Sequence, residues 1–242
     1  MEALATAHVA SLVVPSRFEG PPGAVNGGWI AGHLASLVAL PRDEAVTVAL
    51  RAPTPLDHRL AILHTGSTVV LAEGEEVLVT ARAAEGVPAH PAPAFVDPVA
   101  AELAGFEFAG YDWHPFPGCY VCGHRRHDHE GLRLFPGPVD GPRGRVAALW
   151  TAPGEGPLPV EAVWGLLDCP TGWAHMSLGG VALLGTITAR QLSDVVGGET
   201  YVVVAEAGRR EGRKLPATGA VYTTRGRLVA ASETIWIDVT GR

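Results

Sequence analysis

The stretch VNGGWIAGHL, residues 25–34, places two adjacent glycines directly ahead of an apolar run with helical spacing. Glycine costs about 1 kcal/mol relative to alanine inside a helix, so a pair at its start needs a physical reason. The apolar positions recur on one stripe, which predicts a helix over residues 27–40. Asn26 is a favoured N-cap residue, and glycines in a first turn let another group approach the free backbone N–H groups closely.

The sequence around this helix indicates an internal repeat of two similar units. A second apolar helix is predicted over residues 159–176, and both helices are accompanied by alternating runs split by glycine turns. The predicted strands are 45–53, 59–66, 67–75, 76–84, 131–139, 144–153, 183–192, 200–210, 215–224 and 227–238. One helix beside several antiparallel strands is buried only if the sheet wraps around it, and two such units can join edge to edge. The predicted fold class is α+β.

The segment between the two copies differs from both of them. Residues 86–118 are rich in proline and alanine and lack strand alternation, which predicts a linker with one short helix around Pro98–Leu103. The predicted organisation is an N-terminal half at residues 1–85, this linker, and a C-terminal half at residues 119–242.

The composition restricts the classes of function. The 242 residues are 47% hydrophobic and 18% charged, with a formal net charge of −7, which disfavours nucleic acid because phosphate binding needs a basic surface. No apolar run approaches the roughly 18 residues of a membrane helix, and the N-terminus lacks the basic start of a signal peptide. Three cysteines are too few for a disulfide framework. We therefore expect a cytoplasmic protein with no membrane partner.

Two stretches resemble the tandem, or double, hotdog-fold acyl-CoA thioesterases of the thioesterase-like superfamily. In that family a His-Gly-Gly sequence opens the central helix, and Asn26, Gly27 and Gly28 match it with asparagine in place of histidine. The second stretch is residues 119–137, CYVCGHRRHDHEGLRLFPG. It is similar to a segment of these proteins in which Cys-x-x-Cys-Gly is followed by a short turn and then by Gly-Leu-x-Leu at the start of a strand. The resemblance covers most of the chain apart from residues 86–118. It implies two antiparallel sheets, each wrapped around one long central helix.

The resemblance also implies hydrolysis of an acyl thioester, with coenzyme A as part of the substrate and no other cofactor. In the family a glycine N–H polarises the thioester carbonyl and an acid farther along the helix acts on water. Residues 33–35 contain no acid, whereas Asp168 lies in the apolar run of the second helix, where an unpaired carboxylate is costly. We expect one composite site, with Asp168 as general base or nucleophile and with Gly27, Gly28 and Asn26 around the carbonyl.

Five further residues are assigned to substrate binding. Trp29, His33 and Trp164 lie on the two helices near the expected catalytic groups, and the tryptophans, with Trp173 added, are expected to shorten the acyl pocket. Arg213 and Lys214 follow a strand, where the resemblance implies a turn that can meet the phosphates of coenzyme A.

In the opposite pairing of the helices, residues 159–163 lack a Gly-Gly opening and residues 33–35 lack the acid. We expect it to be degenerate, with Glu161 compensating the helix dipole. Thr218, Ser232 and Glu233 on the late strands are further candidates for orienting water.

The cysteines leave an alternative open. Cys119 and Cys122, followed by His124, His127 and His129, have a spacing typical of zinc sites. Two cysteines with two of these histidines, such as His124 and His127, would complete a structural site. Two small buried cysteines ahead of a strand, or a disulfide between them, would need no metal. A zinc-stabilised interaction protein is therefore one alternative.

Two other functions fit the predicted fold. A non-catalytic protein that binds acyl-CoA or lipid is favoured by Asn26 in place of histidine and by the acid missing from the first helix. A hotdog dehydratase would use a histidine with an acid in an Asp-x4-His arrangement, which the sequence lacks. Double hotdogs often pair further, so a homodimer is one possible assembly.

Overall fold

The computed structural model describes residues 7–85, 91–127 and 130–241. Residues 86–90 of the predicted linker, residues 1–6 and 242 of the predicted halves, and His129 of the predicted zinc site lie outside these ranges. The helices are α1 (Gly27–Ser36), α2 (Pro98–Phe106) and α3 (Val160–Met176). The strands of the main sheet are β1 (Ala7–Val13), β2 (Val46–Leu50), β3 (Arg59–Thr65), β4 (Thr68–Glu73), β5 (Glu76–Ala83), β6 (Gly137–Pro138), β7 (Arg145–Thr151), β9 (Ala182–Gln191), β11 (Thr200–Ala207), β12 (Lys214–Thr223) and β13 (Leu228–Asp238).

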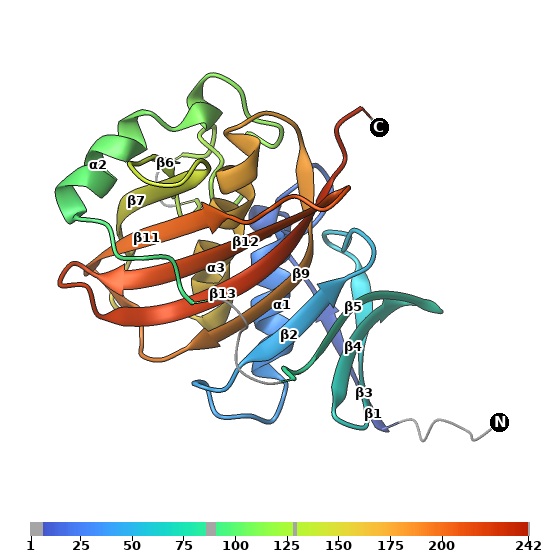
Figure 1. Cartoon of the computed structure of the whole chain (residues 1–242). Helices are drawn as coiled ribbons and strands as arrows, with labels where there is room; N and C mark the ends of the chain where they lie inside the picture. The colour runs from blue at the N-terminus through green and yellow to red at the C-terminus, as the bar shows by residue number, and fades with distance from the viewer. Residues whose placement is uncertain (1–6, 86–90, 128–129, 242) are drawn as a thin grey trace.

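These strands form one antiparallel sheet of eleven strands, in the order β1-β3-β4-β5-β2-β9-β13-β12-β11-β7-β6 (Figure 1). A separate ribbon pairs β8 (Gly156–Pro157) with β10 (Val196–Gly197). The prediction of two sheets is corrected here, because β2 and β9 pair from Val46↔Ala189 to Ala49↔Thr186 and join the strands of both halves. This pairing satisfies the backbone groups of two strands that would otherwise be exposed edges.

The two central helices lie side by side on one face of this sheet (Figure 1). Helix α1 contacts β2, β4, β5 and β9, whereas α3 contacts β7, β9, β11, β12 and β13. Glycines of α1 allow the two helices to approach: a Cβ on Gly28 would lie 2.5 Å from the Cβ of Asp168, and one on Gly32 would lie 2.8 Å from the Cα of Glu161. Close packing is therefore one physical reason for glycine near the start of α1.

The predicted linker covers part of the sheet. Helix α2 packs on β6, β7 and β11. Val96 and Ala101 are buried against Val202 and Val204 of β11. Because side chains alternate across a strand, these valines lie on the face opposite to α3. The segment from Val96 to helix α2 thus covers the outer face of the second half, whereas Phe108 and His114, farther along, pack against Trp173 of α3.

Several boundaries differ from the sequence-based predictions. Helix α1 ends at Ser36 rather than at residue 40, and the run predicted as a strand over 131–139 contains only the two-residue β6. Strand β1, which pairs with β3, was not predicted because residues 7–13 carry no clear alternation. Among the described residues, no helix has the length and apolar character needed to span a membrane.

Candidate active site

The site lies where the start of α1 meets the middle of α3. Asn26 caps α1 through its side-chain Oδ1, which accepts from the Trp29 N–H at 2.9 Å. Its Nδ2 donates to Asp168 Oδ2 at 3.2 Å, and the Gly28 N–H donates to the same oxygen at 2.7 Å. The structure therefore brings Asn26 and Gly28 of the first half together with Asp168 of the second.

Asp168 is the buried acid at this junction, with 1% of its surface exposed. Burial, which disfavours the charged form, raises the pKa of its carboxyl to about 7, although the hydrogen bonds from Gly28 and Asn26 oppose this shift. Oδ1 receives no hydrogen bond from any residue that the structure describes. Because buried polar atoms in proteins are nearly always paired, an unpaired carboxylate oxygen at this depth calls for an explanation such as a functional role.

A cavity of about 260 Å³ adjoins this carboxyl group. Its walls are mainly apolar and come from both halves, including Leu50, Leu184, Trp236 and Ile237. Asn26, Gly27, Thr54 and Asp168 also line it. Thr54 Oγ1 is buried and, like Asp168 Oδ1, has no partner among the described residues. An apolar cavity with a few convergent unpaired polar atoms has the character of a ligand site.

The predicted substrate-binding residues Trp29, His33 and Trp164 are absent from the walls of this cavity. The Trp29 ring stacks on the His33 ring, with centroids 5.5 Å apart, and His33 Nδ1 lies 2.9 Å from Glu161 Oε1 at the start of α3. Trp164 is buried against Gly32 in the crossing of the helices. Trp29 and His33 are four residues apart and therefore share one face of α1, which packs towards Phe18 and Glu161 and not towards the cavity.

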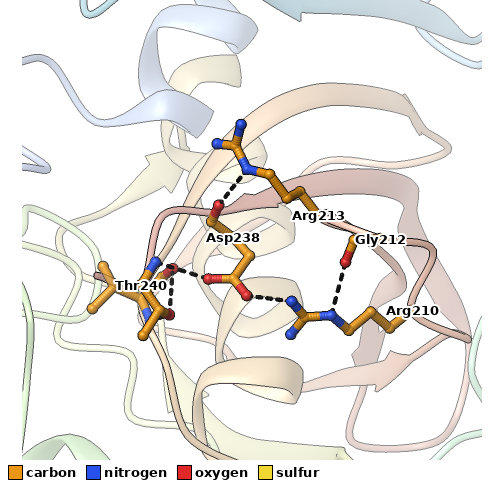
Figure 2. Close-up of polar contacts among 6 residues, drawn as sticks. Arg210, Gly212, Arg213, Asp238 and Thr240 are labelled. Carbon is orange, nitrogen blue, oxygen red and sulfur yellow. Dashed lines mark hydrogen bonds and ion pairs between the residues drawn. The ribbon is translucent and has the colours of Figure 1, made fainter. Parts of the chain in front are cut away.

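Arg213 and Lys214 are exposed at the start of β12, and Figure 2 shows Arg213 beside Asp238. The Arg213 Nε donates to the Asp238 carbonyl at 3.1 Å, while Arg210 pairs with the Asp238 carboxylate at 2.5 Å. A second hollow of about 450 Å³ is lined by Arg143 and Arg210, and it shares the wall residue Met176 with the first cavity. The sequence predicted cationic residues here only at 213 and 214. The structure adds Arg143 and Arg210 to this cationic surface.

The three cysteines of the chain meet beside Asp168. Cys119 and Cys169 have their Sγ atoms 3.7 Å apart, and all three Sγ atoms, Cys122 included, lie within 4.8 Å of one another. Hydrogen bonds from the Cys122 and Cys169 thiols hold the pKa of Cys119 well below its ordinary value. Burial raises the pKa of Cys122, and donation to Cys119 raises that of Cys169.

Of the histidines of the predicted zinc site, His124 and His127 do not join this group. His124 is half-buried and lies against the rings of Tyr111 and His114, whereas His127 is exposed. Sequence analysis missed Cys169 because nothing in its spacing connects it with Cys119, and it missed Thr54 because a lone threonine in a loop carries no signal.

Comparison with solved structures identifies the fold. The chain is similar to a hotdog-fold protein of unknown function from Alicyclobacillus acidocaldarius, with a TM-score of 0.64, 17% identity, and coverage of 99% of this chain and 97% of the other. It is also similar to the tesB protein of Mycobacterium avium subspecies paratuberculosis, with a TM-score of 0.61, 14% identity, and coverage of 97% and 96%.

A third similar structure is the acyl-CoA thioesterase II TesB2 of Mycobacterium marinum, with a TM-score of 0.52, 12% identity, and coverage of 98% and 96%. No protein-family model matches the sequence, and no curated protein matches it. Because each structure matches nearly from end to end, the predicted hotdog fold is confirmed for the whole chain. At these identities the likeness establishes the fold alone.

Proposed function

We propose that the protein hydrolyses an acyl thioester, such as an acyl-CoA, at one composite site between its two halves. The observation that carries the proposal is the contact of the Asp168 carboxyl on α3 with the Gly28 N–H and the Asn26 amide at the start of α1. Thioesterases among the structures of the same fold support the choice of reaction.

Asp168 is assigned the role of general base. Gly28 and Asn26 hold Oδ2, and Oδ1 has no partner among the described residues. We assign Oδ1 to the attacking water, which would have to reach this buried atom from the adjoining cavity. A carboxylate with a pKa near neutrality is suited to this task, because it can take and return a proton near the working pH. The carboxylate removes a proton from water as the oxygen attacks the thioester carbon. The C–S bond then breaks, and the proton passes to the leaving thiolate.

The developing oxyanion is assigned to the first turn of α1. Gly27 lines the cavity, and its N–H is one of the donors that a helix leaves unpaired at its start. This division gives the two glycines different roles, since the Gly28 N–H positions Asp168 while the Gly27 N–H faces the carbonyl. Oxyanion donors contribute about 3 kcal/mol to transition-state stabilisation where one has been removed.

The cavity walls favour a compact acyl group, and the neighbouring arginines favour a carrier that bears phosphates. Trp173 and Trp236 line the cavity of about 260 Å³ and restrict its length. The arginines of the second hollow, Arg143 and Arg210, are suited to phosphates, with Arg213 and Lys214 beside them. We assign this cationic surface to the phosphates of coenzyme A.

The test compares Asp168→Ala with wild type on a panel of acyl-CoAs of increasing chain length. Loss of a general base lowers turnover by about 10²- to 10⁴-fold. Glu161→Ala is the matched control, because it removes an acid from the same helix at the end away from the cavity, and it should retain activity. Unchanged hydrolysis by Asp168→Ala would remove the proposed mechanism.

A non-catalytic acyl-CoA or lipid-binding protein is the second candidate. It is favoured by the Gly28 N–H, which is already engaged by Asp168 instead of being open to a carbonyl. Saturable binding of an acyl-CoA by the wild-type protein, without release of free thiol over the whole panel, would replace hydrolysis with this function.

A further inference from the structure

The three cysteines of the chain converge on one point, although they come from separate segments. Cys119 and Cys122 lie in the turn that precedes β6, and Cys169 lies on α3. The sequence holds three cysteines in 242 residues. All three are buried with their Sγ atoms within 4.8 Å of one another. Such convergence suits a ligand that takes several sulfur atoms at once.

The spacing of two of the sulfur atoms matches a tetrahedral metal, and the third lies within 4.8 Å of both. Zinc binds thiolate sulfur at about 2.3 Å, so two sulfurs on a regular tetrahedron lie about 3.8 Å apart. Cys119 Sγ and Cys169 Sγ are 3.7 Å apart. A disulfide would need about 2.05 Å and would leave the third cysteine without a partner. We propose that Cys119, Cys122 and Cys169 together bind one Zn²⁺ ion.

Donors around the sulfurs are arranged for thiolates. The Asn26 Nδ2 lies 3.7 Å from Cys119 Sγ and 3.6 Å from Cys169 Sγ. Hydrogen bonds of this kind orient metal ligands and tune their charge. The start of α1, which carries Asn26, also places the positive end of a helix dipole beside the cluster.

The turn that carries the first two ligands is held in place before any metal binds. The Gly123 N–H donates to the Cys119 carbonyl at 2.9 Å, and a Cβ on Gly123 would lie 2.5 Å from the Cys119 backbone N and O atoms. The Tyr120 N–H donates to the Glu19 carbonyl at 2.6 Å. The ion would therefore tie a tight turn to α3 next to Asp168.

The fourth position opens towards the cavity. All three cysteines line it, so a water molecule can complete the tetrahedron. His114 also lines the cavity, but its Nε2 lies 3.1 Å from the Cys122 carbonyl and its Nδ1 accepts from the Phe116 N–H at 3.0 Å. Both ring nitrogens are thus engaged. The predicted set with His124 and His127 is replaced by Cys169 as the third ligand.

The experiment measures metal directly and does not depend on thioester hydrolysis. The full chain is reduced, loaded with Zn²⁺, desalted and assayed by mass spectrometry of the metal, together with a count of free thiols. We expect about one zinc per chain, with the thiols protected from alkylation until a chelator is added. Cys122→Ser should lose the zinc, whereas His124→Ala and His127→Ala should retain it.

A spectroscopic measurement on the wild-type protein covers the case in which Cys122→Ser fails to fold. Co²⁺ in place of Zn²⁺ should show the intense near-ultraviolet charge-transfer absorption of thiolate ligands. Wild-type protein that keeps less than about a tenth of an equivalent of zinc, with all thiols reactive, would overturn the proposal. A folded Cys122→Ser variant with undiminished zinc, or a Co²⁺ spectrum without thiolate absorption, would also overturn it.

Discussion

Replacing Asp168 by asparagine is expected to abolish hydrolysis and, above neutral pH, to make the protein more stable. The substitution is close to isosteric. The amide oxygen of asparagine can accept the hydrogen bonds from Gly28 and Asn26 that Oδ2 accepts now. The amide nitrogen takes the place of Oδ1, which has no partner among the described residues. The main difference is that asparagine cannot ionise.

The size of the effect follows from the titration of the buried carboxyl. Desolvation raises the pKa of Asp168 from its ordinary 3.8 to about 7 in the folded protein. Between these values the unfolded chain is ionised while the folded protein keeps its proton, so wild-type stability falls as pH rises. Each pKa unit corresponds to about 1.4 kcal/mol, which gives about 4 kcal/mol for the whole interval. The free energy of unfolding of the asparagine variant does not have this dependence on pH.

The assay is urea unfolding of both proteins at about pH 5 and about pH 8, where the integrated difference is about 3 kcal/mol. A chelator is present throughout, so that metal at the cysteines does not contribute. We expect the stability of the variant relative to wild type to increase by this amount between the two pH values, a shift of roughly 6 to 12 °C in the midpoint of thermal unfolding. The same stability difference at both pH values would refute the assignment of Asp168 as a buried carboxyl with a raised pKa.

Two further predictions concern the packing and charge of the helix pair. Gly32→Ala should cost about 1–3 kcal/mol, because the new Cβ would lie 2.8 Å from the Glu161 Cα. Gly105→Ala in α2 is its control, since there the nearest atom is 3.5 Å away, and it should be neutral or stabilising in the same urea experiment. Glu161→Gln should cost about 1 kcal/mol near pH 7. The hydrogen bond from His33 lowers the pKa of Glu161, so its contribution is present above the ordinary carboxyl pKa and disappears in acid as pH falls through the folded value. A cost of Glu161→Gln that persists unchanged at about pH 3 would contradict this.

The sequence predicted the elements well because their patterns are local. The stripe on α1, the apolar run of α3 and the glycine turns between strands each occupy one short window. The joining of β2 to β9 depends on which strand edges meet in space, and no window contains both strands. Strand β1 was missed for a related reason, because its assignment depends on the edge of β3 that it covers.

Some residues of the candidate site could likewise be predicted from local sequence patterns, and others only from the fold. Asp168 and Gly28 stand out in sequence because each breaks a local rule: a carboxylate in an apolar helix and a glycine pair at a helix start. Thr54 and Cys169 break no such rule, and only their placement in the cavity wall makes them notable. Trp29 obeys every local rule for a pocket residue, yet it packs between Phe18 and His33 away from the cavity.

The two ends of the helix pair differ in how completely their acids are paired. At one end, Asp168 is buried with a free oxygen beside a cavity. At the other end, Glu161 is paired with His33, and Trp29 stacks over that histidine. A symmetric homodimer of single hotdogs must repeat any change at both ends, whereas a tandem chain can fill one end with a satisfied ion pair and aromatic rings. In this chain the paired acid, Glu161, and the acid with an unpaired oxygen, Asp168, lie at separate ends, so a substitution at one end need not be repeated at the other.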